Sequence, residues 1–234
     1  MTLESDVREA VETVDLDELE VRELNRRLHE PAAGGRVRVL HPRGRHSIAA
    51  GLHAPYEVEI DGHVGYYCAG MNQQATVRVA GNAGVGVAEN MMSGLVEVEG
   101  SASQSAGASA HGGLLRIGGD ASARCGISLK GADIVVAGSV GHLSAFMAQT
   151  GCLVVCGDAG EALGDSIYEA RIYVRGAVAG LGADCIEKPL EDEHLRQLSE
   201  LLDRAGVDAD PTEFRRYGSA RRLYNFEIDN AGAY

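Results

Sequence analysis

The sequence of 234 residues contains no tryptophan, only three phenylalanines and only five prolines, and it is poor in positive charge. Its 21 Lys and Arg residues face 34 Asp and Glu residues, so the formal net charge is −13. This deficit argues against nucleic acid as the main partner, because duplex binding rests on neutralising phosphates with basic groups. No apolar run approaches the roughly 18 residues that a membrane-spanning helix needs, so no membrane partner is expected either.

The first residues also lack the basic and then apolar order that marks a secretory signal peptide. We therefore expect the protein in the cytoplasm. The length fits one domain with appendages and allows a sizeable buried core.

Glycine is abundant, with 31 residues, and its spacing explains the abundance. Seven glycines, called the coil glycines below, follow one another at intervals of 19 residues: Gly62, Gly81, Gly100, Gly119, Gly138, Gly157 and Gly176. Branched aliphatic residues stand four and two positions before every one of them, from Val58 and Ile60 to Ile172 and Val174. The position between these two is mostly polar and begins with alternating charge: Glu59, Arg78, Glu97, Arg116, Val135, Val154, Tyr173.

Apolar residues that alternate with polar ones predict a short half-buried strand in each 19-residue repeat. A fixed period of this length is typical of solenoids. Small residues two and three positions after each coil glycine predict a tight corner, where glycine reaches positive φ and backbones approach closely. The absence of hexads argues against a left-handed hexapeptide helix, and period-two strands exclude an αα-solenoid. The predicted fold is all-β: a right-handed parallel β-helix of about seven regular coils.

The chain divides into three predicted segments. Residues 1–35 form an N-terminal helical cap, with a helix over 15–30, and residues 36–190 form the β-helix domain. Residues 191–234 form a C-terminal helical segment and tail, with one helix over 191–205 and a second helix start at Asp210 and Pro211. The apolar residues of the tail either pack back on the β-helix or dock a partner: Leu223, Tyr224, Phe226, Ile228.

The sequence assigns no catalytic, cofactor-binding or metal-ligating residue. Cys68 and Cys125 occupy the same repeat position three coils apart, about 14 Å by strand spacing, which is too far for a disulfide or a shared ion. The five cysteines show no zinc or iron–sulfur spacing, and we expect them to be reduced structural or interface residues.

Methionine and aromatic residues break the pattern in the segment four to twelve positions after the coil glycines. Part of this segment is predicted to point into the core, namely Met91, Leu129 and Ile167. The rest has the composition favoured at protein–protein interfaces. We therefore predict a subunit interface formed by Tyr66, Tyr67, Met71, Met92, Phe146, Met147 and Tyr168. The alternative is that these residues belong to the core alone.

The repeat also resembles a known family. The pattern G-x-x-G-x-x-x-G, intact at 157–164 and with Ser in place of its middle Gly at 100–107 and 119–126, resembles the C-terminal β-helix domain of the glutamate synthase large subunit. A related β-helix component of formylmethanofuran dehydrogenase shares this repeat. The resemblance covers roughly residues 36–190. Segments such as HVGYYCAGMNQ, GVAENMMSG and GHLSAFMAQTG are more similar still to the stand-alone β-helix subunit of N-methylglutamate synthases.

The resemblance implies a function in a complex. It implies two partners, a glutamine amidotransferase-like subunit and a glutamate synthase-like subunit that carries FMN and iron–sulfur, with no cofactor and no catalytic residue in this chain. The implied reaction joins methylamine and glutamate to give N-methylglutamate and ammonia. Glutamate synthase proper or formylmethanofuran dehydrogenase are the alternative hosts. A self-sufficient β-helix enzyme such as a polysaccharide lyase would need a secretion signal and clustered charged residues on one face, and neither is apparent.

Overall fold

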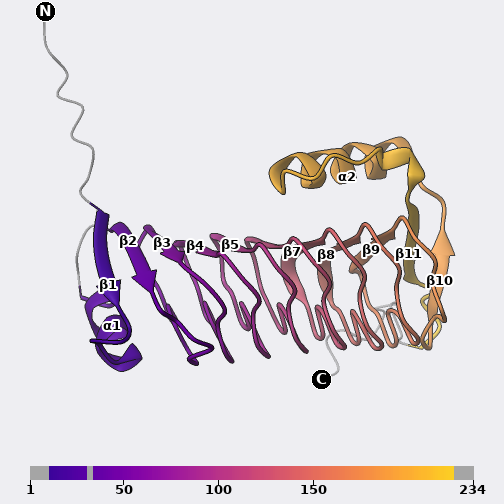
Figure 1. The fold of residues 1–234 in the computed structure, drawn as a ribbon. Helices are drawn as coiled ribbons and strands as arrows, with labels where there is room; N and C mark the ends of the chain where they lie inside the picture. Colours follow the sequence, from indigo (N-terminus) through magenta and orange to yellow (C-terminus); the bar gives the residue numbers. More distant parts are fainter. Residues whose placement is uncertain (1–10, 31–33, 224–234) are drawn as a thin grey trace, which may run out of the picture.

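The computed structural model describes residues 11–30 and 34–223, and one eleven-stranded sheet runs along the whole molecule (Figure 1). The strands are β1 (Val11–Asp15), β2 (Gly35–Leu40), β3 (Tyr56–Ile60), β4 (Thr76–Val79), β5 (Leu95–Val98), β6 (Leu114–Ile117), β7 (Lys130–Val136), β8 (Thr150–Val155), β9 (Arg171–Val174), β10 (Cys185–Lys188) and β11 (Arg215–Ser219). The helices are α1 (Val21–Leu28), α2 (Asp192–Arg204) and the short 3-10 helix η1 (Pro211–Glu213).

The prediction of a parallel β-helix is confirmed. Each strand from β1 to β8 pairs in parallel with the next, and from β3 onward equivalent residues such as Val58 and Val77 pair at the 19-residue period. The branched residues of these strands fill one continuous core. The small residues two positions after the coil glycines form a second parallel ladder of isolated bridges, from Val64 to Val178. The period therefore sets both the strands and the corners.

A ladder of side-chain hydrogen bonds runs along the corner of the coils, and we call it the corner ladder. The residue after each of the first six coil glycines accepts, through its side chain, a hydrogen bond from the backbone N–H of the equivalent residue one coil later. The six bonds measure 2.7–3.1 Å and run from His63 to Asn82, Ser101, Asp120, Ser139, Asp158 and Ala177. Each bond satisfies a corner N–H that the strand pairing leaves free.

The corner ladder explains the coil glycines. A Cβ on Gly138 would lie 2.2 Å from Asp120 Oδ1, and one on Gly157 would lie 2.5 Å from Ser139 Oγ. Among the coil glycines only Gly62 has a positive φ, of 135°. Except at Gly62, the side chains and backbone of the preceding coil, and not a left-handed backbone conformation, therefore require glycine at this position.

The other two glycines of the 157–164 repeat serve different purposes. A Cβ on Gly160 would lie 2.9 Å from the backbone of Gly141 in the preceding coil, so this position needs close backbone approach. Gly164 has a φ of 64°, in the left-handed region that glycine enters freely. At the predicted corner position the expectation of positive φ is therefore wrong, since none of Gly65, Gly84, Gly141 and Gly160 has a positive φ. The expectation of close backbone approach is confirmed there, because a Cβ on any of the four would lie within 3 Å of backbone in the preceding coil.

The sheet begins earlier than the sequence predicts. Strand β1 lies inside the predicted helical cap and pairs in parallel with β2, so the described part of the solenoid already includes Val11. Helix α1 begins at Val21 and not at 15, because Asp15 forms a turn: its carboxylate accepts a hydrogen bond from the Asp17 N–H and its carbonyl from the Leu19 N–H. An Asp side chain that bonds nearby backbone competes with helix formation in this way.

The C-terminal end extends the sheet beyond 190. Strand β11 lies between β9 and β10 and is antiparallel to both. Helix α2 and the 3-10 helix η1 lie where helices are predicted, and the Asp210 carboxylate accepts the Thr212 N–H at 2.8 Å. Leu223 is exposed, whereas Tyr224, Phe226 and Ile228 lie outside the described residues.

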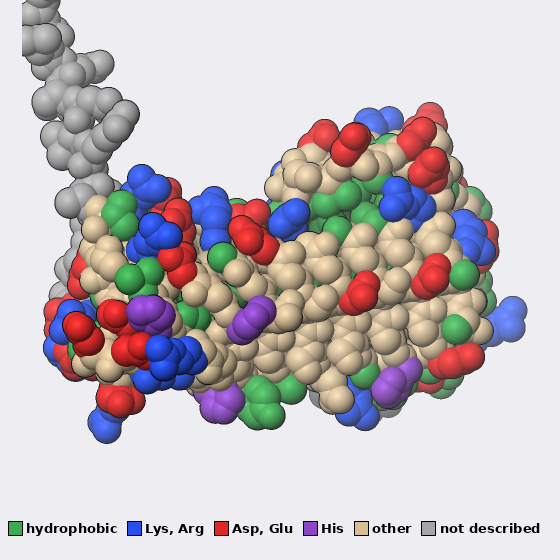
Figure 2. Space-filling model, in the orientation of Figure 1, with side chains coloured by type: hydrophobic (Ala, Val, Ile, Leu, Met, Phe, Trp, Pro, Cys, Tyr) green, Lys and Arg blue, Asp and Glu red, His purple; other side chains and the backbone are tan. Residues whose placement is uncertain are grey.

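Helix α2 covers the outer face of the later strands and forms a second core (Figures 1 and 2). Leu198, Leu201 and Leu202 pack there against the outward residues of the later coils, including Val135, Val154 and Tyr173. The Arg116 guanidinium donates a hydrogen bond to the Ala205 carbonyl at the end of α2, at 2.9 Å. The outward column is thus charged where it meets water, as in the Arg78–Glu97 pair at 2.7 Å, and apolar under α2. Among the described residues, no helix is both long and apolar enough to cross a bilayer.

Candidate functional site

The seven predicted interface residues lie on the turns that follow the coil corners. The side chains of Tyr66, Tyr67, Met71, Met92 and Met147 are exposed, between 38% and 54%, while Phe146 and Tyr168 are half-buried. The predicted core residues of the same segment, Met91, Leu129 and Ile167, are fully buried. The turns therefore divide into an inward and an outward set, as the sequence suggests.

The outward residues form two groups and not one continuous strip. Met71 and Met147 occupy the same repeat position four coils apart, about 19 Å by strand spacing. The polar residues Asn90, Ser109 and Ser128 stand between them. The first group, called the N-terminal apolar group below, consists of Tyr66, Tyr67, Met71 and Met92. The second consists of Phe146, Met147 and Tyr168.

The N-terminal apolar group borders a hollow of about 270 Å³, lined by Ser47, Ala50, Tyr67, Gly70, Met71, Glu89 and Asn90. Tyr67 and Met71 have φ values of 59° and 57°, which large side chains rarely adopt. Both backbones are held by bonds to the next coil, from the Tyr67 N–H to the Val85 carbonyl and from the Met71 N–H to the Glu89 carbonyl, each 2.8 Å. Two large side chains are thus presented outward on a fixed backbone, which lowers the entropy cost of docking a partner.

The described part of the chain buries all five cysteines as free thiols. Burial raises the pKa of Cys68, Cys125, Cys152 and Cys185 to about 12. A thiol acts as nucleophile or metal ligand in its thiolate form. These side chains are therefore protonated packing residues at neutral pH.

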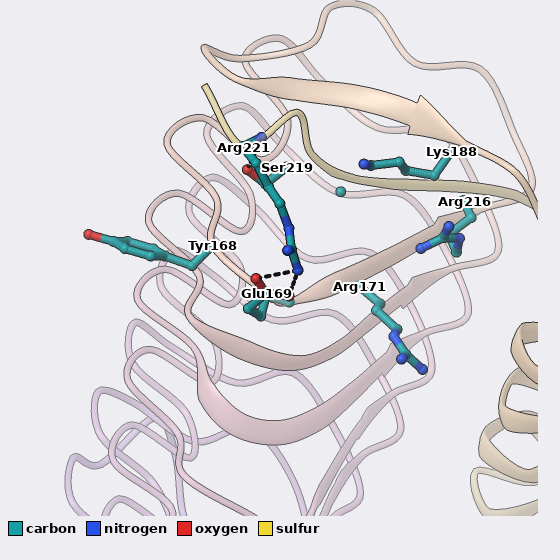
Figure 3. Close-up of a pocket in the computed structure, with 9 residues that line it drawn as sticks. Tyr168, Glu169, Arg171, Lys188, Arg216, Ser219 and Arg221 are labelled. Atoms are coloured by element: carbon teal, nitrogen blue, oxygen red, sulfur yellow. Dashed lines mark hydrogen bonds and ion pairs between the residues drawn. The ribbon is translucent and has the colours of Figure 1, made fainter. Parts of the chain in front are cut away.

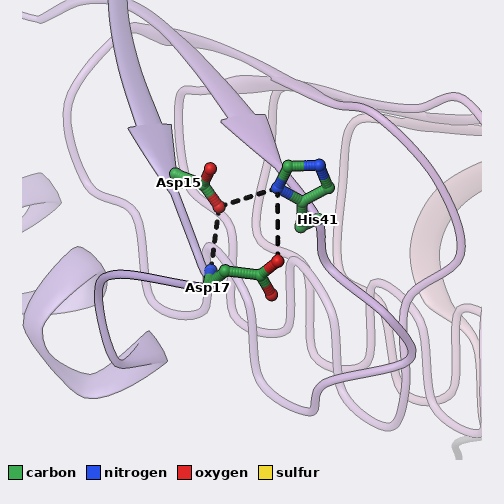
Figure 4. Close-up of side chains that lie close together, drawn as sticks. All are labelled: Asp15, Asp17 and His41. Atoms are coloured by element: carbon green, nitrogen blue, oxygen red, sulfur yellow. Dashed lines mark hydrogen bonds and ion pairs between the residues drawn. The ribbon is translucent and has the colours of Figure 1, made fainter.

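Asp15, Asp17 and His41 form a small cluster at the N-terminal end (Figure 4). His41 Nδ1 lies 2.8 Å from Asp15 Oδ1 and 3.6 Å from Asp17 Oδ2, and Arg43 pairs with Asp17. The hydrogen bond between Asp15 and His41 lowers the pKa of the carboxyl and raises that of the imidazole. The ligand atoms could surround a cation only after Arg43 and the His41 proton leave, so the cluster is an ion-pair network that joins β1 to the end of β2.

Sequence reasoning missed this cluster, because Asp15 and Asp17 fall in the predicted helix over 15–30 and His41 precedes Gly62, where the 19-residue spacing begins. A second group, Glu191, Glu193 and His194, lies at the start of α2. There His194 Nδ1 accepts the Glu191 N–H at 3.2 Å as part of a capping box, so its geometry serves the helix.

No family model matches the sequence. A curated protein, Protein GlxC of Rhizobium meliloti (strain 1021), is 60% identical over 225 residues, which cover 94% of this chain and 99% of that protein. This chain belongs to the GlxC family. The GlxC match covers 94% of this chain, so it extends beyond the repeats into both end segments.

Proposed function

We propose that this GlxC-type chain is a non-catalytic structural subunit of a glutamate synthase-like complex, and specifically of an N-methylglutamate synthase. The main support for a subunit related to glutamate synthase is the nearly full-length match to GlxC, taken together with the G-x-x-G-x-x-x-G repeat. The specific reaction, methylamine plus glutamate to N-methylglutamate and ammonia, rests on the resemblance of the segments between the repeats.

The architecture supports an organising role. The sheet, the corner ladder and the second core under α2 make a stiff rod, on which partners can be held at fixed separation. The partners we propose are a glutamine amidotransferase-like subunit and a subunit that carries FMN and iron–sulfur, all in the cytoplasm. In this proposal the cofactors and the reacting groups belong to those partners. The buried, protonated thiols of this chain are consistent with that division.

The test is to purify the tagged chain from its native host under mild conditions and to record its native mass and visible absorption. The proposal predicts a large assembly with flavin and iron–sulfur bands that forms N-methylglutamate from methylamine and glutamate. Molybdenum- or tungsten-pterin subunits in the assembly would instead identify the formylmethanofuran dehydrogenase host. A colourless particle of this chain alone would overturn the proposal.

The interface assignment is tested by placing a charge in the N-terminal apolar group. Tyr67→Asp and Met92→Asp should lower the yield of the assembly, because each buries a carboxylate without a partner at the contact. Ile186→Asp, on strand β10 and exposed to 42% compared with 48% for Tyr67, is the matched control. Normal yield from both test variants, or an equal loss from the control, would contradict the assignment.

A further inference from the structure

A basic hollow opens at the C-terminal end of the solenoid, where β9, β11 and β10 lie side by side (Figure 3). Its volume is about 210 Å³, and its lining includes Glu169, Arg171, Lys188, Arg216, Gly218 and Arg221. Strand register explains the gathering, because Arg216 on β11 pairs with Lys188 on β10 and with Tyr173 on β9. Residues directly opposite in a sheet share one face, and this is the outer face on which α2 packs against Tyr173.

The charge of this hollow is opposite to that of the whole chain. Four basic residues, Arg171, Lys188, Arg216 and Arg221, line it together with one carboxylate, Glu169, in a protein of net charge −13. Like charges that are partly withdrawn from water repel one another more strongly than in bulk solvent. An anion in the hollow would relieve this repulsion.

Existing contacts hold the arginine side chains in place, and two of the arginines keep donors to spare. Both oxygens of Glu169 accept from Arg221, at 2.8 and 2.9 Å. Arg171 donates to Gln197 Oε1 at 2.7 Å, and Arg216 donates through Nε to the Pro189 carbonyl at 2.8 Å. A guanidinium carries five N–H groups, so Arg171 and Arg216 each keep several donors. Among the described residues, none forms an ion pair with Lys188.

Gly218 creates the space. A Cβ built on this residue would meet only Lys188 Cγ at 3.8 Å, Ala170 O at 3.9 Å and Lys188 Cε at 4.0 Å, which are ordinary contacts. Its φ lies outside the positive range that side chains avoid. The backbone therefore tolerates a side chain at 218, and the hollow exists because none is there.

We propose that this hollow is a binding site for a small anion that presents carboxylate or phosphate oxygens to Arg171, Lys188 and Arg216. Arginine matches the planar, paired acceptors of these groups, and the lysine supplies a mobile point charge. The volume is below the roughly 300–1,000 Å³ of sites for drug-sized ligands, which favours a small metabolite over an extended chain. This inference goes beyond the proposed function and does not depend on it.

The test is calorimetric titration of the full chain with inorganic phosphate and with succinate, at fixed ionic strength. The site predicts saturable binding of at least one probe, with one ion per chain, and the preferred probe identifies the phosphate or the carboxylate class. Lys188→Gln should weaken binding about tenfold, since it removes a charge-assisted contact. Arg22→Gln, an equal charge change on exposed α1 at the other end of the solenoid, should change it less than twofold.

A third variant separates loss of the site from loss of the fold. Gly218→Glu places a carboxylate in the hollow, so it should abolish binding while the thermal midpoint stays within a few degrees of that of Gly218→Ala. Saturable binding that Lys188→Gln weakens and Gly218→Glu removes supports the site. Absence of saturable binding of both probes, or an equal effect of Lys188→Gln and Arg22→Gln, overturns it.

Discussion

Replacing a coil glycine in the middle of the solenoid by alanine should destabilise the protein. At most positions that alanine can occupy without strain, the same replacement stabilises a fold by lowering the entropy of the unfolded chain. A methyl group on Gly138 would lie 2.2 Å from Asp120 Oδ1 and 2.7 Å from the Gly119 carbonyl oxygen. The Asp120 side chain can rotate away, but it then loses its hydrogen bond to the Ser139 N–H, now 2.8 Å. The Gly119 backbone can move little, because its N–H donates to the Gly100 carbonyl at 2.8 Å and its carbonyl accepts from the Gly138 N–H at 3.0 Å.

The magnitude follows from three contributions. The exposed hydrogen bond is worth about 0.5–1.5 kcal/mol, and the backbone crowding costs about 1–3 kcal/mol. The smaller entropy of the unfolded alanine chain returns about 0.4–1 kcal/mol. Gly138→Ala should therefore lower the free energy of unfolding by about 2 kcal/mol, which is roughly a 1 M shift of the urea midpoint.

Urea unfolding of the full chain, followed by circular dichroism, measures this shift. Gly35→Ala is the matched control, because its Cβ would meet the Tyr56 ring at an ordinary 3.7 Å. In the double variant Asp120→Ala/Gly138→Ala the total loss should be smaller than the sum of the two single effects, since the side-chain clash is gone. A Gly138→Ala midpoint equal to that of wild type or of Gly35→Ala would refute the reasoning about the corner ladder.

Three further predictions concern titration, reactivity and packing. His41→Gln should lower the thermal midpoint more at pH 5.5 than at pH 8.5, because the hydrogen bond to Asp15 raises the pKa of His41 in the folded protein. The protonated imidazole therefore contributes its full stabilisation below pH about 6.5, the pKa of an unperturbed histidine, and this stabilisation is lost as the pH rises through the pKa of folded His41. Equal losses at both pH values would contradict this prediction. The pKa of Cys68 is raised to about 12, so a thiol reagent at pH 8 should label it only on unfolding, and rapid labelling of the folded chain would count against this burial. Leu201→Ala should lower the free energy of unfolding by about 2–4 kcal/mol and should reduce hydrogen-exchange protection in α2 first. A loss of protection confined to the early coils would show that α2 packs elsewhere.

The fold was predictable because one period carries two kinds of information. The columns that begin at Val58 and Ile60 mark the strands and, at the same time, set the register between coils. The corner ladder was not predicted, because its members vary among His, Asn, Ser and Asp and share only an acceptor atom. That shared property, from His63 to Asp158, was a signal present in the sequence.

The surfaces were harder to predict because they depend on long-range packing. The change of the outward column from Arg116 to Val135 marks where α2 lies, yet nothing in the helix itself says which face it will cover. Strand β11 shows little alternation of apolar and polar residues, and Tyr217 is its one large apolar residue. Its own sequence therefore hardly indicates a strand, still less one that lies between β9 and β10. The basic hollow depends on that insertion, which brings Arg216 beside Lys188.

Deleting this chain from its host tests whether it organises the subunits of the proposed complex. The native mass and the N-methylglutamate-forming activity of the tagged flavin subunit would be measured in a host that lacks this chain and again after the purified chain is added back. The proposed role predicts that the flavin subunit is present but separated from the amidotransferase-like subunit, with activity lost, and that the added chain restores both. If the other components assembled and were active to the same extent without this chain, it would have no organising role.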